Sequence, residues 1–495
     1  MIAAYAVSSV REAEALAMAG LHEGELMARA ASALAGIASA RLGGPGGRRV
    51  VALVGAGNNG GDALYALAAL ARDGASAVAA RVGESVHQGA LRAALEAGVL
   101  VLDAFGGGRD SASALSSVLG EADLVIDGIV GLGGRPGLSP QIEALLRDVS
   151  DRAYVLAVDL PSGADPDGVV AARSCVFADE TVTFIAAKPV HLLPATEAAV
   201  GRLTVLDIGV SVTATPAVER VSADDVALLW PRPGPADDKY SRGVLGIVAG
   251  GQKYTGAALL AVTSAVCSGA GMVRYVGPST PTMLIRSQVP EAVIGQGQVQ
   301  AWLVGPGLDV GDTSAGGRAQ SAAALSALDS GQPVVVDAGA LDLIVERRTT
   351  PTLLTPHAGE LATLLSRLEG VSVDRAMVVS APLAHARRLA DLTNATVLLK
   401  GATTLVVSPG SSCLPVRSQA DAPPWLATAG SGDVLAGLAG TLLASGLSAR
   451  DCGSLAALVH GLAADASNPG GPVRALGVAQ AIPGVVAALM VRRSA

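Results

Sequence analysis

Short runs of apolar residues alternate with longer helical patterns along most of the chain, which is typical of an α/β protein. In the first half, a helical pattern covers residues 10–40 and another runs from Gly60 to Leu70. The apolar runs that predict strands here are residues 49–54, 76–82, 124–127, 155–159, 180–184 and 203–207. Since helical segments separate these strands, we expect a doubly wound parallel sheet. Several strands end in a carboxylate, at the sheet edge where such folds bind ligands.

A second series of apolar runs predicts another α/β unit. Its strands are expected at residues 244–248, 301–304, 333–336, 352–354, 395–399 and 404–407. Between the two series, residues 213–216 and the proline-rich segment 231–235 interrupt the pattern. No clear repeat relates the two halves, so two different α/β domains are expected. The predicted division is a first domain over residues 1–212, a linker over 213–224 and a second domain over 225–495.

One charge-free stretch tests whether the chain is bound to a membrane. Residues 254–273 contain no charged side chain and are about long enough to span a bilayer. They are, however, rich in glycine, serine, threonine and alanine, and the single cations Lys253 and Arg274 flank them. We therefore expect a buried helix of an α/β domain here and no membrane partner.

The composition of the 495 residues limits the class of partner. Half are apolar but only 2% are aromatic, so sizeable cores can form and must be built from alanine, valine and leucine. The formal net charge of −8, without a long basic run, argues against nucleic-acid binding and leaves small molecules or proteins. The beginning of the chain has no apolar core of signal-peptide type, so we expect a cytoplasmic protein.

The cysteines also indicate a cytoplasmic protein. The chain has four cysteines, which are Cys175, Cys267, Cys413 and Cys452. They lie far apart and fit no disulfide or zinc pattern. We expect all four to be small buried apolar residues in a reducing compartment.

Lysine is unusually rare. Only four of the 35 basic residues are lysines, and these are Lys188, Lys239, Lys253 and Lys400. Lysine differs from arginine in being a compact charge whose pKa shifts readily. In a chain that otherwise uses arginine, the four lysines are candidates for roles that arginine cannot fill.

The glycine-rich loop at residues 428–433, which ends in Asp433, is the strongest chemical signal, and an apolar helical stretch over 434–440 follows it directly. Glycines let backbone N–H groups crowd around an anion, and a helix N-terminus adds partial positive charge. A carboxylate here can take a proton from a hydroxyl group while the amides hold a phosphoryl group. A tight turn in which Asp433 is an ordinary helix N-cap explains the same residues.

A second glycine-rich loop, residues 55–62, follows the first predicted strand and opens a helix. Its G-x-G-x-x-G pattern is by itself a weak dinucleotide signal. An NAD-dependent dehydrogenase would need an acidic residue about 20 residues further on, but the run at 76–82 supplies Arg81 instead. The side chains of Asn58, Asn59 and Asp62 rather indicate a polar pocket for a phosphorylated ligand, with room for a metal ion.

Further motifs follow this loop in order. They are Asp127 with the glycine-rich run 131–137, Val-Asp-Leu-Pro-Ser-Gly at 158–163, Thr183-Phe184 with Lys188-Pro189, and Asp-Ile-Gly at 207–209. In this combination, roughly residues 1–212 resemble the NAD(P)H-hydrate epimerases, which implies a Rossmann-like domain. The chain departs from that family at Ala63, where glycine is usual, and at Arg29, where asparagine is common.

The resemblance implies a pocket for a hydrated nicotinamide nucleotide. Its residues would be Asn58, Asn59, Gly60, Gly61, Asp62, Gly131, Leu132, Gly133, Gly134, Arg135, Pro136, Gly137 and Asp159. Asp159 would be the acid or base and Lys188 its electrostatic partner, although a solvated loop cation is the alternative for Lys188. A potassium ion would be held by Asn59, Asp127 and Ser162, all of which offer hard oxygens.

The second half carries its own ordered set of motifs. They are residues 238–243, 250–257, 305–308, 354–360, Lys400-Gly401 and the loop at 430–433. In this order, roughly residues 225–495 resemble the ADP/ATP-dependent NAD(P)H-hydrate dehydratases, which implies a ribokinase-like α/β fold. The chain departs at Asp238, where histidine is frequent, and at Gly339, where a second aspartate often follows Asp337. All four lysines fall within the motifs of one family or the other.

This second resemblance implies two neighbouring binding regions. The hydrate pocket would be lined by Ala257, Gly307, His357 and Asp433. The nucleotide, ADP or ATP with Mg²⁺, would be held by Lys400, Gly401, Ala402, Thr403, Thr404 and Gly432. Taken alone, His357 would more often be structural, and Glu360 competes as a first-turn carboxylate of the helix that follows.

Together the resemblances imply a bifunctional repair enzyme. The first domain would interconvert the R and S epimers of NAD(P)H hydrate. The second would dehydrate the S form by phosphoryl transfer to the ring hydroxyl, with Asp433 as base and Lys400 and the loop amides steadying the charge. Two alternatives stay open: a ribokinase-like small-molecule kinase that stops at a phosphorylated product, and a catalytically silent N-terminal binding or regulatory domain. Because related dehydratases form homo-oligomers, an oligomer such as a tetramer is expected.

Overall fold

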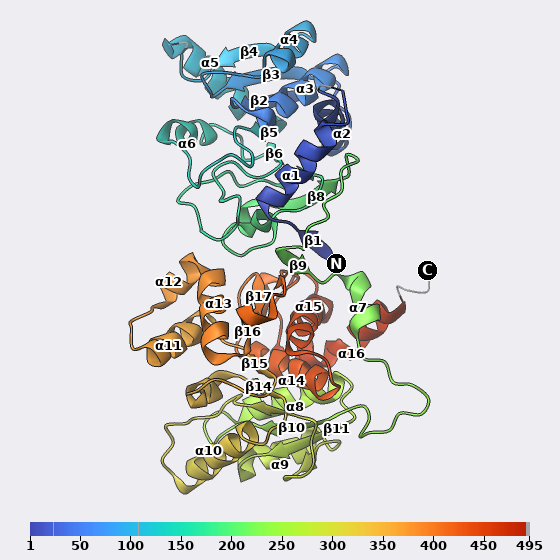
Figure 1. Ribbon diagram of the computed structural model, residues 1–495, viewed down its shortest axis with the longest axis vertical. Helices are drawn as coiled ribbons and strands as arrows, with labels where there is room; N and C mark the ends of the chain where they lie inside the picture. The colour runs from blue at the N-terminus through green and yellow to red at the C-terminus, as the bar shows by residue number, and fades with distance from the viewer. Residues whose placement is uncertain (23, 107, 492–495) are drawn as a thin grey trace. The chain divides into compact units, whose positions relative to one another are not determined.

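The computed structural model describes residues 1–22, 24–106 and 108–491. The chain divides into two compact units (Figure 1). The N-terminal unit is Ala3–Val218, and the C-terminal unit contains Met1–Ile2 together with the chain from Glu219 onward. The predicted linker at 213–224 spans this division.

The N-terminal unit is built on a seven-stranded sheet with the order β4-β3-β2-β5-β6-β7-β8, in which all neighbours are parallel. Its strands are β2 (Arg49–Val54), β3 (Ser76–Arg81), β4 (Leu100–Asp103), β5 (Leu124–Gly128), β6 (Tyr154–Val158), β7 (Glu180–Phe184) and β8 (Arg202–Leu206). Its helices are α1 (Val7–Met18), α2 (Glu25–Leu42), α3 (Asn58–Arg72), α4 (Gln88–Glu96), α5 (Gly108–Gly120) and α6 (Pro140–Leu146), with 3₁₀ turns η1 (Pro189–His191) and η2 (Glu197–Ala199).

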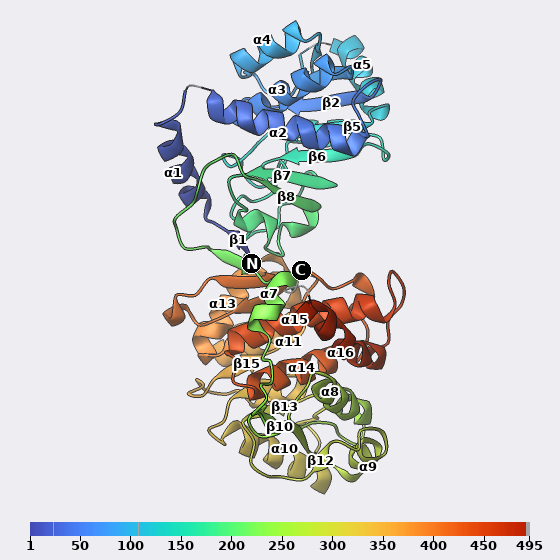
Figure 2. The same cartoon turned by 90° about the vertical axis from the view of Figure 1, so that its right-hand side faces the viewer.

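Helices cover both faces of this sheet (Figure 2). Because successive side chains of a strand point to opposite faces, Val50, Ala52 and Val54 of β2 pack with α2, α3 and α4. Val51 and Leu53 pack instead with α5 and α6 on the other face. The strand order reverses between β2 and β5, and such a reversal leaves a crevice at the carboxyl ends of the two strands.

The C-terminal unit is built on an 11-stranded sheet with the order β1-β9-β18-β17-β16-β15-β14-β13-β10-β11-β12. Its strands are β1 (Ile2–Ala4), β9 (Val218–Arg220), β10 (Val244–Val248), β11 (Met272–Val276), β12 (Val293–Ile294), β13 (Ala301–Val304), β14 (Val334–Val336), β15 (Thr352–Leu354), β16 (Thr396–Leu399), β17 (Thr404–Val407) and β18 (Val416–Gln419). The pairs from β16 through β12 are parallel, while β17 pairs antiparallel with both β16 and β18.

Two groups of helices flank this sheet in Figure 2. The helices are α7 (Ala223–Leu229), α8 (Thr255–Cys267), α9 (Ser279–Gln288), α10 (Ala315–Leu328), α11 (Ala358–Glu369), α12 (Arg375–Ser380), α13 (Pro382–Thr393), α14 (Ser431–Ala444), α15 (Ala449–Ser467) and α16 (Ala475–Val491), and the 3₁₀ turns are η3 (Ala338–Leu343), η4 (Gly410–Ser412) and η5 (Pro424–Leu426). Helices α8, α14, α15 and α16 share one apolar core with the sheet, while α10 and α13 contact the strands from the other group.

Helix α14 lies at the centre of the apolar core. Every residue from Val434 to Ala444 is buried, as expected for a helix that is apolar on all sides. It packs closely on α8, since a Cβ added to Gly437 would lie 2.3 Å from the Ala261 carbonyl oxygen. Small residues therefore let these two backbones approach, which explains how a core with few aromatic residues is filled.

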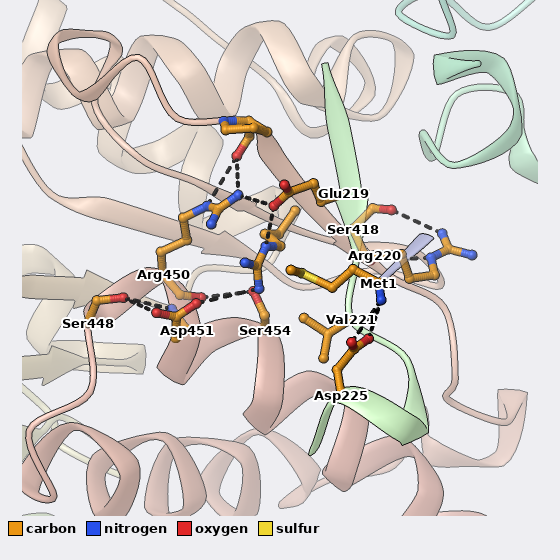
Figure 3. A network of polar contacts seen from close by, with 12 residues as sticks. Met1, Glu219, Arg220, Val221, Asp225, Ser418, Ser448, Arg450, Asp451 and Ser454 are labelled. Carbon is orange, nitrogen blue, oxygen red and sulfur yellow. Dashed lines mark hydrogen bonds and ion pairs between the residues drawn. The ribbon is translucent and has the colours of Figure 1, made fainter. Parts of the chain in front are cut away.

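A network of ion pairs joins β9 to β18 and α15 within the C-terminal unit (Figure 3). Glu219 accepts hydrogen bonds from Arg417 Nε at 3.0 Å and from Arg450 Nη2 at 2.6 Å. Nearby, the α-amino group of Met1 bonds Asp225 Oδ1 at 2.8 Å. These contacts fix the β9 edge of the 11-stranded sheet and the first residue of the chain to the same unit.

Most of the predicted strands are confirmed. Residues 49–54, 180–184, 244–248, 301–304, 352–354 and 404–407 form strands with the predicted bounds. The predicted helix over 10–40 is wrong in one respect, because two helices, α1 and α2, separate after Met18 and Gly24 has a φ of 79°. The charge-free stretch at 254–273 is also not one helix, since α8 ends at Cys267 and β11 begins at Met272.

The expectation that all four cysteines are buried is wrong. Cys452 is buried, Cys175 and Cys267 are partly buried, and Cys413 is exposed. All four are free thiols, as their spacing predicts. Within the described residues, none of the helices has the length and apolar character needed to cross a bilayer.

Candidate active sites

A cavity of about 1300 Å³ opens at the carboxyl ends of β2 and β5 in the N-terminal unit. The predicted residues that line it are Asn58, Asn59, Asp62, Gly131, Leu132, Gly133, Asp159 and Lys188. Helix α1 and the residues after it contribute Arg11, Glu14 and His22 to the wall. The structure thus gathers residues from distant motifs around one space at the point where the strand order reverses.

The other predicted pocket residues lie behind this lining. A Cβ added to Gly60 would lie 2.2 Å from the Gly55 carbonyl oxygen, and one added to Gly61 would lie 3.2 Å from the His87 ring. These two glycines therefore allow the turn from β2 into α3 to close tightly. The remaining members of the glycine-rich run, which are Gly134, Arg135, Pro136 and Gly137, do not line the cavity.

Asp159 and Lys188 form a buried ion pair, with 2.5 Å between Asp159 Oδ1 and Lys188 Nζ. The Thr183 hydroxyl donates to the same carboxylate oxygen at 2.9 Å, and Lys188 Nζ also donates to the Phe184 carbonyl at 3.1 Å. Burial raises the pKa of Asp159, but the charge and hydrogen bond of Lys188, with smaller contributions from His191 and Thr183, lower it below the ordinary aspartate value. Asp159 is therefore held in its ionised form, and Lys188 is buried instead of being the solvated cation considered above.

His191 holds the backbone of this pair in place. The Lys188 backbone N–H donates to His191 Nδ1 at 2.9 Å, so Nε2 carries the proton and donates to the Asp159 carbonyl at 2.8 Å. Asp159 follows the end of β6 instead of ending the strand, and its φ is 66°. Such a left-handed conformation is strained for a residue other than glycine and persists because neighbouring contacts impose it.

A second carboxyl group in the cavity has the opposite environment. Asp62 is 8% exposed, and its Oδ1 has no hydrogen-bond partner among the described residues. Burial, then the charges of Asp159 and Glu14, raise the pKa of Asp62 well above the ordinary value. Burial and the charge of Asp159 also raise the pKa of Glu14, against the opposing charges of Lys188 and Arg11.

Two of the predicted potassium ligands, Asp127 and Ser162, contact each other around a buried carboxylate. Asp127 accepts hydrogen bonds from the Ser162 hydroxyl at 2.6 Å and backbone at 2.8 Å, and burial raises its pKa in spite of these bonds. Asn59 donates its amide to the Val158 carbonyl at 2.6 Å, which leaves its side-chain oxygen as an acceptor. A buried carboxylate with neutral partners and further hard oxygens fits a monovalent cation. Among the described residues, no cluster of three or more histidine, cysteine or acidic side chains has metal-binding geometry.

Ala63 and Arg29, the two residues at which this unit differs from the usual epimerase pattern, lie outside the cavity lining. Ala63 is fully buried against Gly128, where an added Cβ would be 2.5 Å from the alanine methyl group. Arg29 donates to the Ile208 carbonyl at 3.0 Å and to Glu25 at 2.6 Å. Ala63 thus packs α3 on β5, and Arg29 joins α2 to the segment after β8.

In the C-terminal unit, Asp433 lies in the first turn of α14. This helix begins directly after Gly430, whose φ is 88°. An added Cβ at Gly430 would lie 2.5 Å from a Leu260 methyl group, so both conformation and space require glycine. Burial, then the charge of Asp337, raise the pKa of Asp433 to about 7, although Lys400 opposes the shift. No side-chain capping bond accompanies the start of α14, so Asp433 is not the simple N-cap of this helix.

Lys400 faces Asp433 from the end of β16. Its Nζ lies 2.9 Å from Asp337 Oδ1 and 3.7 Å from Glu360 Oε2. The Thr355 hydroxyl donates to the same Asp337 oxygen at 2.8 Å. Burial lowers the pKa of Lys400, but the charges of Asp337 and Glu360 raise it above the ordinary value, so its ammonium group stays charged. Gly432 adjoins this group, since a Cβ added there would be 3.5 Å from Nζ.

The other predicted residues of this site lie on neighbouring loops. Gly307 approaches Ala257 so closely that an added Cβ would be 2.7 Å from the alanine methyl group. His357 pairs with Lys400 in an isolated parallel bridge. Gly401, Ala402 and Thr403 follow in the turn between β16 and β17, and Thr404 begins β17. His357 Nδ1 accepts backbone N–H groups of α11 at 3.0 and 3.1 Å, while Glu360 accepts the His357 N–H at 2.8 Å. Both competing structural roles, those of His357 and Glu360, are thus present.

This unit differs from the usual dehydratase pattern at Asp238 and Gly339, and the difference at Gly339 has a steric explanation. A Cβ added to Gly339 would lie 2.1 Å from the Leu308 carbonyl oxygen, so an aspartate there would collide with the backbone. Asp238 instead accepts backbone N–H groups from Tyr240 and Ser241 in an exposed turn. The remaining lysines, Lys239 and Lys253, each place Nζ 5.2 Å from the ring of the tyrosine that follows.

Several residues of the two sites escaped the motif search. They are Glu14 and His191 in the N-terminal unit and His460 in the C-terminal unit. His460 is buried on α15, its Nε2 lacks a partner among the described residues, and burial with the charge of Lys400 lowers its pKa to about 4. Glu14 and His460 lie in helices whose apolar periodicity conceals them, so only the fold could bring them into view.

Comparison with known proteins covers both units. Residues 245–476 match the NAD(P)H-hydrate dehydratase family, and residues 23–190 match the family described as YjeF-related protein N-terminus. A bifunctional NAD(P)H-hydrate repair enzyme Nnr of Mycobacterium leprae is 41% identical over 94% of both chains. The Mycobacterium tuberculosis enzyme of the same name is 42% identical over 90% of this chain and 89% of its own.

Among solved structures, the C-terminal unit is similar to an ADP/ATP-dependent NAD(P)H-hydrate dehydratase from Bacillus subtilis that was co-crystallised with ATP/Mg²⁺. That similarity has 24% identity and a TM-score of 0.47, and it covers 55% of this chain and 99% of the other. The full-length identity to the mycobacterial enzymes decides the assignment, because it extends across both units and both sets of motifs. The chain therefore belongs to the family of bifunctional NAD(P)H-hydrate repair enzymes.

Proposed function

We propose that this protein restores NAD(P)H from its hydrates in two steps. The N-terminal unit interconverts the R and S epimers, and the C-terminal unit dehydrates the S epimer at the expense of ADP or ATP. Membership of the repair-enzyme family supports both activities. The observation that carries the proposal is that each unit has its own base next to a lysine: Asp159 with Lys188, and Asp433 with Lys400.

In the C-terminal unit, Asp433 takes the proton of the ring hydroxyl as that oxygen attacks the terminal phosphoryl group of the nucleotide. A pKa of about 7 suits this role, since about half of the group is then ionised near neutral pH and the ionised form is a good proton acceptor. The amides of residues 430–432 and the Lys400 ammonium stabilise the negative charge that develops on the phosphoryl oxygens. Departure of phosphate, assisted by the ring nitrogen, leaves a carbon–nitrogen double bond, and loss of a proton from the adjacent ring carbon then yields NAD(P)H.

We assign the remaining residues of this site by position. Ala257, Gly307 and His357 would contact the hydrate, and Gly401, Ala402, Thr403, Thr404 and Gly432 would contact the nucleotide. Mg²⁺ would enter with the nucleotide phosphates and neutralise part of their charge. The parallel bridge between His357 and Lys400 supports this division, because it places the two sets side by side.

In the N-terminal unit, Asp159 would act on the hydroxyl of the bound hydrate, and the loops that contain Asn58 to Asp62 and Gly131 to Gly137 would hold the nucleotide. Asn59, Asp127 and Ser162 would hold K⁺, which would offset the buried charge of Asp127. Lys188 keeps Asp159 in its ionised form, and its positive charge balances the negative charge of that carboxylate. A cavity of about 1300 Å³ is large enough for a dinucleotide-sized ligand.

The test is the recovery of absorbance at the reduced-nicotinamide band. The protein is added to a mixture of both NADH-hydrate epimers with ADP or ATP, Mg²⁺ and K⁺. Complete recovery supports both activities, and recovery that stops at the S fraction would leave a working dehydratase beside a silent N-terminal unit. A stable phosphorylated product without recovery would overturn the repair function in favour of a small-molecule kinase.

Assembly and location are proposals of the same kind. We propose a cytoplasmic homo-oligomer, such as a tetramer, with small-molecule substrates as its partners. Light scattering on the purified protein across a range of concentrations measures the mass directly. A mass equal to that of one chain at all concentrations would contradict the oligomer.

A further inference from the structure

The N-terminal cavity contains two aspartates in opposite surroundings. Asp159 has a lysine, a threonine hydroxyl and a fixed backbone around it. Asp62 lines the same cavity from the first turn of α3, is 8% exposed, and leaves Oδ1 without a hydrogen-bond partner among the described residues. A buried carboxylate without partners is unfavourable, so this oxygen either carries a proton or awaits a ligand.

We propose that Asp62 is the proton donor of the epimerase reaction and acts in concert with Asp159 as the base. The inference rests on the proposed function of this unit and adds a second catalytic group to it. Two carboxyl groups that share one space and differ in protonation state can take one proton and give another in the same step. Asp62 and Asp159 meet both conditions.

The reaction balances with these two groups alone. The hydroxyl-bearing carbon of the hydrate is bonded to the ring nitrogen, so it is a hemiaminal. Asp159 takes the hydroxyl proton, the carbon–oxygen double bond forms, the carbon–nitrogen bond breaks, and Asp62 gives its proton to the nitrogen. After rotation of the aldehyde, nitrogen adds to its other face, Asp159 returns its proton to oxygen and Asp62 recovers its own. Both carboxyl groups end as they began, and no oxidant or reductant is needed.

The other charged groups around Asp62 favour a protonated Asp62 beside an ionised Asp159. Arg11, Glu14 and His22 face the cavity from α1 and the loop after it, His87 lies before α4, and Lys188 lies at the start of η1. The negative charges of Asp159 and Glu14 both favour the protonated form of Asp62. Lys188 is committed to Asp159, Thr183 and the Phe184 carbonyl, so it leaves Asp62 uncompensated.

Glu14 is the competing candidate for the donor. It lines the same cavity and burial also raises its pKa, but the charges of Arg11 and Lys188 favour its ionised form. It also lies on α1, in which Val10 is the buried residue, so its position is less firmly fixed than that of Asp62. The structure therefore favours Asp62, and Glu14→Gln is the variant that separates the two.

The test measures epimerisation of the pure R hydrate by NMR without added nucleotide, so that dehydration does not interfere. For the wild-type chain we expect the rate to fall at high pH, where Asp62 loses its proton. Asp62→Asn should lower kcat by about 100-fold or more with a smaller change in KM, and should remove this alkaline limb. Asp62→Glu, which restores an acidic proton, should recover part of kcat. A normal kcat and an intact limb in Asp62→Asn, or their loss in Glu14→Gln instead, would overturn the assignment.

An infrared measurement tests the protonation state without relying on activity. At neutral pH, the difference spectrum between the wild-type chain and Asp62→Asn should contain the carbonyl band of one protonated carboxyl group, since the bands of Asp433 and of the other protonated carboxyl groups cancel in that difference. Asp165→Asn is the matched control, because Asp165 is also 8% exposed in this unit but accepts backbone N–H groups from Asp167, Val169 and Val170. It should keep the band. A wild-type chain that shows the band but does not epimerise the hydrate would refute the proposed function and not the protonation of Asp62, whereas an active chain without the band would refute the donor role.

Discussion

Three aspartates have different pKa values because their surroundings differ. Asp159 is paired with Lys188 and stays ionised, Asp62 is buried without a partner, and Asp433 is balanced between Asp337 and Lys400 with a pKa of about 7. Burial raises the pKa in every case, and the position of the nearest lysine decides how much of that shift remains.

Replacement of Asp433 by asparagine tests its role as the base. We expect kcat for dehydration of the S hydrate to fall by about 100-fold to 10,000-fold, the usual contribution of a positioned acid or base. In the wild-type chain, kcat/KM should decline below a pH of about 7 as Asp433 gains its proton. Steady-state rates between pH 5 and 9 give both results. Near-normal turnover in the variant would leave Asp433 as a simple turn residue.

The neighbour of Asp433 offers a second test with a predicted direction. Asp337→Asn removes the negative charge that raises the Asp433 pKa, so the acidic limb of kcat/KM should move to lower pH. The exposed Asp342, five residues along the chain, provides the matched control, and Asp342→Asn should leave the limb in place. The same pH series measures both variants. A limb that stays near pH 7 in Asp337→Asn would show that burial alone sets the pKa.

At the level of the elements, the turn from β2 into α3 depends on one glycine more than on another. A Cβ added to Gly55 would lie 1.8 Å from the Ile129 carbonyl oxygen, whereas one added to Gly57 would meet no atom within 4 Å. We expect Gly55→Ala to cost about 3 kcal/mol or more in unfolding free energy, and Gly57→Ala no more than about 1 kcal/mol.

The positions of the tryptophans make this measurement selective. Trp230, Trp302 and Trp425 all belong to the C-terminal unit, so denaturation followed by their fluorescence reports that unit. Far-ultraviolet circular dichroism reports both units. Gly55→Ala should shift part of the dichroism transition and leave the fluorescence transition unchanged. Equal stability of the two variants would mean that the Ile129 segment can move aside.

The elements also show how far sequence reasoning reaches. Continuous apolar strands such as 180–184 and 244–248 were predictable, because both of their faces are buried in a parallel sheet. β4 was missed because its residues are exposed or half-buried, and β11 because its apolar residues merged with those of α8. The motifs predicted eight of the residues that line the cavity, but not Glu14, because a single carboxylate on an amphipathic helix has no local signature. The left-handed turn at Asp159 depends on His191, 32 residues further on, and no local pattern could indicate it.

At the scale of the whole molecule, each unit contains a complete set of acid–base groups. Asp159→Asn should therefore abolish epimerisation and leave the dehydration rate of pure S hydrate unchanged. With a mixture of epimers and added nucleotide, recovery of absorbance should stop at the S fraction. Far-ultraviolet circular dichroism checks that the N-terminal unit is still folded, since loss of one partner of a buried pair costs about 3–5 kcal/mol. Tryptophan fluorescence checks the C-terminal unit. A reduced rate on pure S hydrate, with that unit folded, would show that the two activities are coupled.

The first strand has a consequence for the order in which the chain folds during synthesis. β1 lies beside β9 at the edge of the 11-stranded sheet, and nearly all of the N-terminal unit lies between them in sequence. β1 must therefore wait until β9, and then the strands beyond it, have been made. The N-terminal unit can fold during that interval and form the bridge between Ala4 and Ala187, while the pairing of β1 with β9 waits. Completion of this sheet edge is expected to be a late event, and to report that both units have been assembled.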